Sequence, residues 1–483
     1  MAIIQGTPRD AIRISYCLEE EIGEDNPVRI IDLIVELVYH INPEIFDNID
    51  NKNAESGRGK YSSRIMTKLL LYSYSQRIKG SRKIEEESHR NIDLKWLINE
   101  LTPDHWTISN FRKNNGNLIL MIKQKFTEIL KSNSYINGKE IVIDGSKIKA
   151  YAGRNYYNKT EIKKWLNKNE TELKKYIQDL EIIDKNEDEF ESRQKELEDK
   201  IKELQKEMAA KDEELSKFTG KKSKWIVKRD EGSRLIKSRD GFIPGYNVQV
   251  STDNHFIIEN IVTSETGDDA LLIPTIEKTE EAIKEKVETV VADKGYYNYK
   301  NLIKLETKEI TSYIPIAKSK KEEIEFRKAE GEDKYICSQG QDLVFKQRNV
   351  KKKNYLANLY VGVNCNNCPL KSKCTTSTKG RYLYINVNSE IVEQLKRRLS
   401  SPEGKIKIKE RKTKIEHIFG TLKLWMGKMP LHLRSKYKVS IEINIWQIVY
   451  NLRRLIGIEG VLGVSKLFTQ IMKNNNKTSL KTT

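Results

Sequence analysis

The sequence predicts a mixed α/β protein, with helices in the first part of the chain and a sheet after them. Apolar residues recur at helical spacing before residue 130, whereas short apolar runs typical of buried strands begin after Lys139. The chain has 483 residues, 37% of them hydrophobic. A chain of this length has room for more than one domain, so we expect separate helical and sheet-containing regions.

The chain is strongly basic, with a formal net charge of +18. An excess of this size favours a polyanionic partner such as a nucleic acid, although a basic protein without one remains an alternative. A membrane span needs about 20 apolar residues, and we find neither such a run nor an apolar signal core in the first residues, MAIIQGTPRD. We therefore expect a cytoplasmic location and no membrane partner.

The N-terminal part is predicted to be helical after a loosely structured lead at 1–27. Helices are expected at 28–38, at 61–77, from Ser81, and after Thr102-Pro103-Asp104, where the last one carries Arg112. Several short helices, with basic residues on the last, indicate a helix-turn-helix-like DNA-binding domain over 28–130. An ordinary helical bundle fits the same pattern.

Strands begin where the periodicity changes. The first, 141–144, is a short apolar run that ends in Asp144, and a hairpin follows at 246–262 with its turn at 252–254. A helix expected at 268–286 leads to a strand that ends at Asp293, and a last short strand is expected at 312–316. Three antiparallel strands followed by a helical crossover place the fourth strand parallel to the first. Both aspartates are therefore predicted to lie at one edge of the sheet.

A third acid could complete a metal site at this edge. Pro402 is expected to start a long helix that carries Glu416. Two Mg²⁺ ions about 3.5–4 Å apart, held by such carboxylates, could activate an attacking oxygen and stabilise a leaving oxygen in phosphodiester chemistry. Each aspartate alone is equally explained as a turn residue, because Gly145 and Lys294-Gly295 follow them.

Two segments are predicted to interrupt the sheet region. Between 156 and 230, Leu166, Leu173 and Leu180 repeat every seven residues, which indicates an antiparallel helical hairpin. The stretch 318–385 is basic and is expected to be irregular. Its four cysteines could bind a structural Zn²⁺ or could be buried free thiols: Cys337, Cys365, Cys368 and Cys374.

Three blocks of the chain resemble the catalytic blocks of DDE-class insertion-sequence transposases. They are IVIDGSKIKA, VVADKGYYNYKNL and RKTKIEHIFGTLK, and the resemblance extends from about residue 28 to 457. It implies an RNase H-like catalytic domain over 139–457, interrupted by the helical hairpin and the cysteine-containing insert, with a C-terminal tail at 458–483.

The resemblance also implies roles for individual residues. The three catalytic, metal-binding acids would be Asp144, Asp293 and Glu416. Some relatives carry a Tyr-Arg-Glu-Lys signature around the glutamate. Lys423 fits its Lys, Lys412 stands at its Arg with Arg411 beside it, and Lys409 stands at its Tyr. Tyr296, after Asp293, could stack on a base or simply pack the strand end. The expected DNA-binding residues are Arg411, Lys412, Lys423, Lys294, Tyr296 and Arg112.

The function implied is that of a transposase, which binds terminal inverted repeats, cleaves DNA to give a 3′-OH and transfers that end into target DNA. Its cofactor would be two Mg²⁺ ions, with Mn²⁺ as a substitute, and it would act as a homodimer associated with the bacterial nucleoid. Two alternatives remain open from the sequence: an RNase H-like nuclease or resolvase, and a DNA-binding protein that has lost cleavage.

Overall fold

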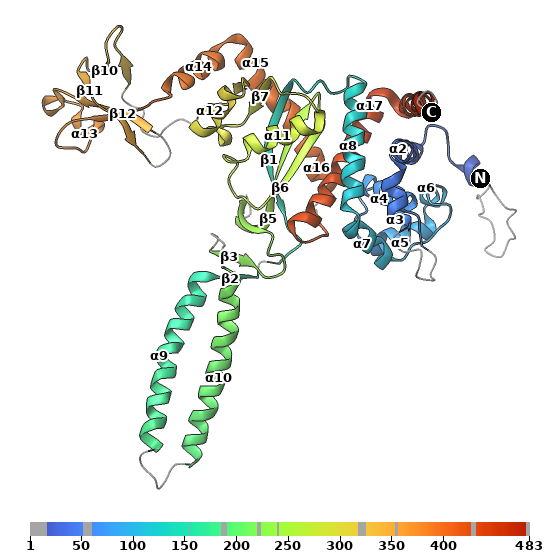
Figure 1. The fold of residues 1–483 in the computed structure, drawn as a ribbon, viewed down its shortest axis with the longest axis horizontal. Coiled ribbons are helices and arrows are strands. Elements are labelled where there is room, and N and C mark those ends of the chain that lie inside the picture. Colours follow the sequence, from blue (N-terminus) through green and yellow to red (C-terminus); the bar gives the residue numbers. More distant parts are fainter. Residues whose placement is uncertain are drawn as a thin grey trace, which may run out of the picture.

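The computed structural model describes residues 17–51, 60–153, 155–184, 191–219, 224–238, 241–316, 325–352, 356–426 and 431–479. Figure 1 shows a helical N-terminal region packed against a body built around a mixed sheet. Two parts project from this body in different directions, a long helical hairpin and a small separate sheet. Of the predicted lead at 1–27, residues 1–16 lie outside the described residues.

The N-terminal region is helical, as predicted. Asp104 caps one of its helices by accepting a hydrogen bond from the Thr107 backbone N–H at 2.9 Å, which confirms the helix-start signal. Gly80, not Ser81, occupies the N-cap of another helix. The helices are α1 (Leu18–Glu21), α2 (Val28–Ile41), α3 (Pro43–Asn51), α4 (Ser63–Ser75), α5 (Ser81–Arg90), α6 (Ile92–Leu97), α7 (His105–Asn114) and α8 (Gly116–Ser132).

The central sheet has six strands, with β5 paired to β1, β4 and β6, and with β7 and β8 following on the other side of β1. β1 is antiparallel to β5 and parallel to β7, which confirms the predicted order of the four strands. The turn between β5 and β6 consists of Asn254 and His255, both with positive φ, as a two-residue hairpin turn requires. The bounds are β1 (Glu140–Lys149), β4 (Arg234–Ser238), β5 (Gly241–Asp253), β6 (Phe256–Thr263), β7 (Thr289–Ala292) and β8 (Thr311–Tyr313).

The prediction that Asp144 ends its strand is wrong. β1 continues to Lys149 because β5 pairs with it from Val142 to Lys149. Ser146 and Ile148 are buried on the continuing strand, so alternating burial extends past the aspartate. Asp144 thus lies inside β1, while the shorter neighbour β7 ends at Ala292, directly before Asp293.

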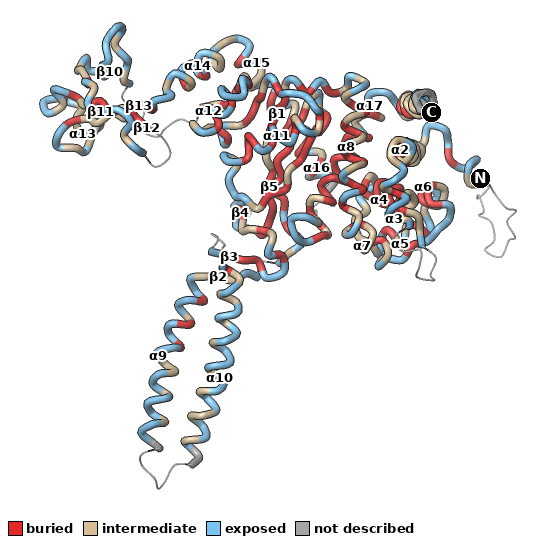
Figure 2. The backbone as a smooth tube through the Cα atoms, in the orientation of Figure 1, coloured by how far each residue is buried: buried red, intermediate tan, exposed pale blue. Residues whose placement is uncertain are grey.

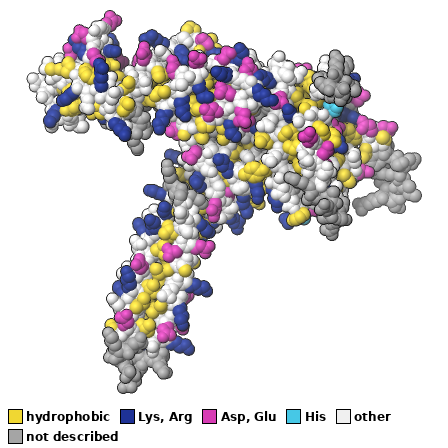
Figure 3. Space-filling view, in the orientation of Figure 1, with side chains coloured by type: hydrophobic (Ala, Val, Ile, Leu, Met, Phe, Trp, Pro, Cys, Tyr) yellow, Lys and Arg dark blue, Asp and Glu magenta, His cyan; other side chains and the backbone are white. Residues whose placement is uncertain are grey.

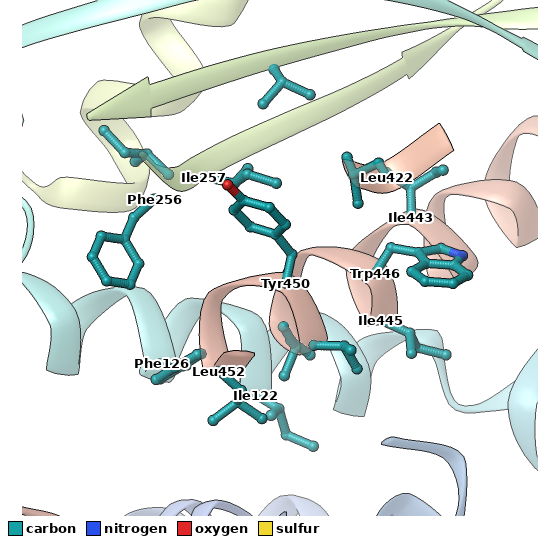
Figure 4. Packing of buried hydrophobic residues seen from close by; sticks show 14 of the residues in the cluster. Ile122, Phe126, Phe256, Ile257, Leu422, Ile443, Ile445, Trp446, Tyr450 and Leu452 are labelled. Atoms are coloured by element: carbon teal, nitrogen blue, oxygen red, sulfur yellow. The ribbon is translucent and has the colours of Figure 1, made fainter. Parts of the chain in front are cut away.

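Helices cover the sheet and complete the core. Figure 4 shows Trp446 and Tyr450 of α17 (Lys436–Ser479) between Ile122 and Phe126 of α8 and Phe256 and Ile257 of β6. The other helices of this region are α11 (Leu272–Ile283), α12 (Tyr299–Thr307), α14 (Ser389–Ser400), α15 (Pro402–Arg411) and α16 (His417–Met426). Of these, α11 corresponds to the helix predicted at 268–286 and is shorter than that prediction.

α17 is longer than the sequence predicts. It extends into the predicted C-terminal tail at 458–483 and is helical to Ser479, apart from a kink at Gly460. An 18-residue window within Lys436–Asn475 has a mean hydropathy of 1.4, so by length and composition this helix could cross a membrane. In the same helix, Glu442 is fully buried and accepts a hydrogen bond from Tyr74 of α4, which ties it to the N-terminal region.

The helical hairpin predicted from the leucine spacing is present as α9 (Lys159–Asp184) and α10 (Glu191–Ser216). Figure 2 shows that most of its residues are exposed or half-buried, and Figure 3 shows an apolar stripe along it. Its buried apolar residues lie at the base, beside the short pair β2 (Tyr156–Asn158) and β3 (Trp225–Val227).

The prediction of an irregular cysteine-containing insert is wrong. The described part of this region forms a five-stranded antiparallel sheet in the order β13-β12-β11-β10-β9. Several of its side chains are half-exposed, so the burial alternation that marks a strand is weak in the sequence. The strands are β9 (Phe326–Lys328), β10 (Lys334–Cys337), β11 (Asp342–Lys351), β12 (Leu356–Gly362) and β13 (Tyr382–Asn386).

Candidate active site

Parallel pairing of β1 with β7 brings two of the predicted acids together. Ile143 pairs with Ala292, and the residues that follow them are Asp144 and Asp293. Buried apolar side chains of both strands anchor this pair in the core, since Ile143 and Ala292 are fully buried. Strand register therefore places the two aspartates at the same level of the sheet, as the sequence predicted.

Arg411, the last residue of α15, lies between the two carboxylates. Its guanidinium is 3.4 Å from Asp144 Oδ2 and 3.4 Å from Asp293 Oδ1. The arginine side chain is only 9% exposed, and its Nε has no hydrogen-bond partner. A buried cation thus bridges both aspartates, which indicates that this edge of the sheet favours positive charge between them.

The protonation of Asp144 responds to this environment. Burial raises the pKa of the Asp144 carboxyl to about 6, and the nearby charges of Asp293 and Asp268 act in the same direction. The Gly145 backbone N–H and Arg411 lower the pKa but do not cancel the effect of burial. A cation close to Asp144 would favour the ionised form of this carboxyl.

The helix that carries Glu416 has an unusual backbone. Residues Lys412–Glu416 form a single π-turn between α15 and α16. In a π-turn the backbone bonds join residues five apart, so Arg411 and Glu416 lie about one turn from each other. In an α-helix, residues four apart would have this relation. Arg411, and not Lys412, is the basic residue of this helix that contacts the aspartates.

Glu416 itself is exposed, and no contact joins it to Asp144 or Asp293 in the described part of the chain. The predicted set of three acids is therefore only partly assembled. Across the described residues, no three His, Cys, Asp or Glu side chains are close enough to hold a metal ion as they stand. Asp144 and Asp293 fit a divalent cation through their adjacent carboxylates, on the condition that Arg411 moves away.

Two predicted DNA-binding residues are buried. Arg112 is 3% exposed and donates hydrogen bonds to the Tyr74 hydroxyl and the Lys79 carbonyl, so it stabilises the N-terminal helices. Tyr296 is 1% exposed and its hydroxyl donates to Gln249 Oε1, so it packs the strand end and does not present a ring to DNA. For both residues the DNA-binding prediction is wrong, because nucleotides cannot reach buried side chains.

The remaining DNA-binding candidates are on the surface or outside the described side chains. Lys294 and Lys412 are exposed, and they directly follow Asp293 and Arg411 in the chain. The side chain of Lys423 lies outside the described residues. Arg411 faces the acids instead of solvent, so its role in the free protein is electrostatic.

The sequence analysis missed one acid near this site. Asp268, in the loop between β6 and α11, accepts hydrogen bonds from Lys147, Asn247 and Gln249. We expected it to open the following helix, but α11 begins at Leu272 and has no side-chain cap. Polar residues at buried positions of β5 were the available signal, since Asn247, Gln249 and Ser251 alternate with apolar residues and are all fully buried.

The four cysteines of the insert line one cavity beside the second sheet. Burial raises the pKa of the Cys374 thiol, and the thiols of Cys365, Cys337 and Cys368 lie near enough to add to this effect. Gly340, three residues after Cys337, has a positive φ and donates its N–H to the Cys337 carbonyl, which closes a tight turn. The prediction that these cysteines form one cluster is consistent with this placement, and all are free thiols.

Two family models match the chain. A "Transposase domain (DUF772)" model matches residues 16–114, and a "Transposase DDE domain" model matches residues 336–456. The first covers most of the N-terminal helices, and the second covers most of the cysteine-containing sheet, Glu416 and part of α17. The strands that carry Asp144 and Asp293 lie between the two matches.

A search of curated proteins finds no match. Among solved structures, the chain is similar to a piggyBac transposase in a synaptic complex with hairpin DNA, with 11% identity and a TM-score of 0.32. That similarity covers 94% of this chain and 82% of the other. Transposase family models thus match both ends of the chain, and the model at the C-terminal end is that of a transposase DDE domain.

Proposed function

We propose that the protein binds the ends of a transposable element, cleaves the DNA there and joins the freed 3′-OH to target DNA. The central sheet would be an RNase H-like core. The observation that carries this proposal is the parallel pairing of β1 with β7, which sets Asp144 and Asp293 side by side. The helix containing Arg411 and Glu416 crosses the same edge of the sheet.

Asp144 and Asp293 would hold divalent cations, Mg²⁺ or Mn²⁺, with Glu416 as a further ligand. Such ions, when bound, activate an attacking oxygen and stabilise the leaving oxygen of the phosphodiester. Arg411 pairs with both carboxylates in the metal-free protein and would have to leave them for an ion to take its place. A shift of the π-turn would turn Arg411 away and Glu416 toward the aspartates, because both residues are on this turn of the helix.

DNA is the proposed partner, bound by a homodimer that pairs two element ends. The net charge of +18 supports a polyanionic ligand. Lysines and arginines are interspersed with acids over the face seen in Figure 3, so contacts specific to the site depend on local residues such as Lys294 and Lys412. These two flank the acids and could contact the phosphates next to the scissile bond.

The test is cleavage of DNA containing the element ends, with Mg²⁺ or Mn²⁺, by the full chain. We expect Asp144→Ala, Asp293→Ala and Glu416→Ala each to abolish cleavage while binding to the same DNA persists. Exposed Glu410→Ala, directly before Arg411 on the same helix, is the matched control and keeps its activity. Full cleavage by all three variants would refute the proposed acids. Cleavage without joining of pre-cleaved ends would identify a nuclease instead.

We also propose that the cysteine-containing sheet holds a structural Zn²⁺ through Cys337, Cys365, Cys368 and Cys374. Four thiolates are the ligand set that structural zinc prefers, and all four line one cavity. The thiols would have to turn inward, because they do not yet converge at ligand distance. We expect about one zinc per chain by metal analysis of the purified protein, lost in Cys365→Ser with Cys368→Ser and retained in Cys17→Ser. A zinc-free wild-type protein would refute this site.

A further inference from the structure

Asp268 is held by more donors than a loop carboxylate needs. Its Oδ1 accepts hydrogen bonds from Lys147 Nζ at 3.0 Å, Asn247 Nδ2 at 2.7 Å and Gln249 Nε2 at 3.0 Å. Asn247 and Gln249 are fully buried on β5, so the sheet itself holds these two donors in place. Three donors aimed at a single oxygen define its position closely, as a site built for a charged group requires.

The carboxylate of Asp268 lies between the two segments that carry the metal-site aspartates. A Cβ on Gly145, the residue after Asp144, would be 3.0 Å from Asp268 Oδ1. A Cβ on Gly295, two residues after Asp293, would be 3.8 Å from Asp268 Oδ2. The Cβ on Gly145 would come closest to Gln249 Nε2, so glycine at position 145 allows Gln249, and the Asp268 carboxylate bonded to it, to lie against β1 at the level of the acids.

A chain of hydrogen bonds joins Asp268 to the turn that follows Asp293. Gln249 donates to Asp268 through Nε2 and accepts from the Tyr296 hydroxyl through Oε1. The Tyr296 backbone N–H donates to the Asp293 carbonyl at 3.0 Å, which closes the turn. Asn301 also donates to the Tyr296 carbonyl at 2.8 Å, so the turn is held from both sides.

The simplest structural role for Asp268 does not account for this geometry. A carboxylate at this position of the loop could cap α11, but its side chain bonds the strands and the helix has no side-chain cap. Only the Asp268 backbone carbonyl serves the helix start, by accepting from the Leu271 N–H. The charged group is thus directed to β1 and β5, toward the elements that present Asp144 and Asp293.

We propose that Asp268 is a positioning residue for the metal site: through Lys147, Gln249 and Tyr296 it fixes the separation of Asp144 and Asp293. The inference rests on the proposed function, because it assigns Asp268 to the same metal-dependent reaction. Its loss is expected to weaken metal binding more than DNA binding or folding. Residues that orient metal ligands typically change metal affinity about 10- to 100-fold when they are replaced.

The test compares Asp268→Asn with Glu265→Gln, an exposed acid in the same loop that removes the same charge. Mn²⁺ binding to the full chain is measured by titration calorimetry, and cleavage is measured across Mn²⁺ concentrations. We expect Asp268→Asn to raise the dissociation constant for Mn²⁺ and the Mn²⁺ concentration for half-maximal cleavage about tenfold, with cleavage largely recovered at saturation. Affinity for DNA containing the element ends should stay the same.

Tyr296→Phe, which removes only the hydroxyl that bonds Gln249, should change both quantities in the same direction by a smaller factor. Equal Mn²⁺ dependence of Asp268→Asn and Glu265→Gln, in a wild-type background that cleaves, would refute the positioning role alone. A loss of cleavage that saturating Mn²⁺ does not recover would also refute it, since a general folding defect gives that result. Wild-type protein that neither binds Mn²⁺ nor cleaves would refute the proposed function together with this inference.

Discussion

The two parts of the candidate site are built in different ways. Asp144 and Asp293 are held by the sheet, where parallel strand pairing over a buried core sets them at the same level. Arg411 and Glu416 come from a helix that changes its hydrogen-bond pattern between them. A strand register can change only by breaking a ladder of bonds, whereas a π-turn can shift by one residue at low cost. The sheet thus provides a fixed pair of acids and the helix provides an adjustable third ligand.

The largest effect is expected from changing the length of the helix between Arg411 and Glu416. One alanine inserted after Thr413 would rotate Glu416 by about 100° relative to Arg411, because each residue turns a helix by that angle. We expect cleavage to fall at least about 100-fold, the usual cost of misplacing a catalytic group. Cleavage rates with Mg²⁺ and circular dichroism of the same samples would check this.

Deletion of Thr413 is the matched control for that insertion. It removes the additional residue of the π-turn, so an α-helix could then present Arg411 and Glu416 four residues apart on one face. We expect cleavage to fall less than in the insertion, because Glu416 stays on the face of Arg411 but can no longer shift through the π-turn. If the insertion were tolerated as well as the deletion, the register of this helix would not matter and the comparison would fail.

A smaller effect is expected at Arg411, which connects the two parts. Arg411→Ala removes the cation that competes with metal ions for Asp144 and Asp293. We expect Mn²⁺ to bind the DNA-free protein about tenfold more tightly, roughly the value of one charge-assisted hydrogen bond. Calorimetric titration of Arg411→Ala against Lys412→Ala, an exposed residue of equal charge, separates this local effect from net charge. Unchanged affinity in Arg411→Ala would mean that the guanidinium does not occupy the cation position.

The smallest effect is expected on the free energy of unfolding, which depends on the charge of the buried Asp144 carboxyl. Its pKa is raised to about 6, above the ordinary value of 3.8, so the folded state binds more protons than the unfolded state between these values. The protonated Asp144 carboxyl therefore contributes to the free energy of unfolding of the metal-free protein below about pH 4. This contribution is lost as the pH rises through 6. The amide side chain of the Asp144→Asn variant stays uncharged at every pH, so the variant does not lose this stability. It also has a weaker contact with Arg411.

We expect Asp144→Asn to be more stable than wild type by about 1 kcal/mol at pH 7.5 in EDTA, with the difference disappearing near pH 4. Thermal unfolding across this range is the measurement. The variant being less stable at pH 7.5 would show that the Arg411 contact outweighs the burial of the charge. In that case the ionised Asp144 carboxyl would not destabilise the folded sheet. The contrast between the fixed aspartates of the sheet and the adjustable helix would then be wrong.

Local patterns predicted much of the fold. Alternating and helical periodicities located the strands with Asp144 and Asp293, the hairpin α9–α10 and the start of the helix at Pro402, because each depends on residues close in the chain. The cysteine-containing sheet was not predicted, since its half-exposed strands lack clear alternation. The DNA-binding predictions for Arg112 and Tyr296 failed because residue type does not reveal burial.

The sequence by itself determined that two strand-borne aspartates would meet at one sheet edge, since the chirality of a crossover leaves few other arrangements. Only the tertiary structure decided that Arg411 lies between them, that Glu416 follows a π-turn, and that Asp268 supports the edge. The contacts of Arg411 with Asp144 and of Asp268 with Lys147 join residues more than 100 positions apart, through the packing of a helix and a loop on the sheet. No local periodicity encodes such contacts, because they depend on how separate elements come together.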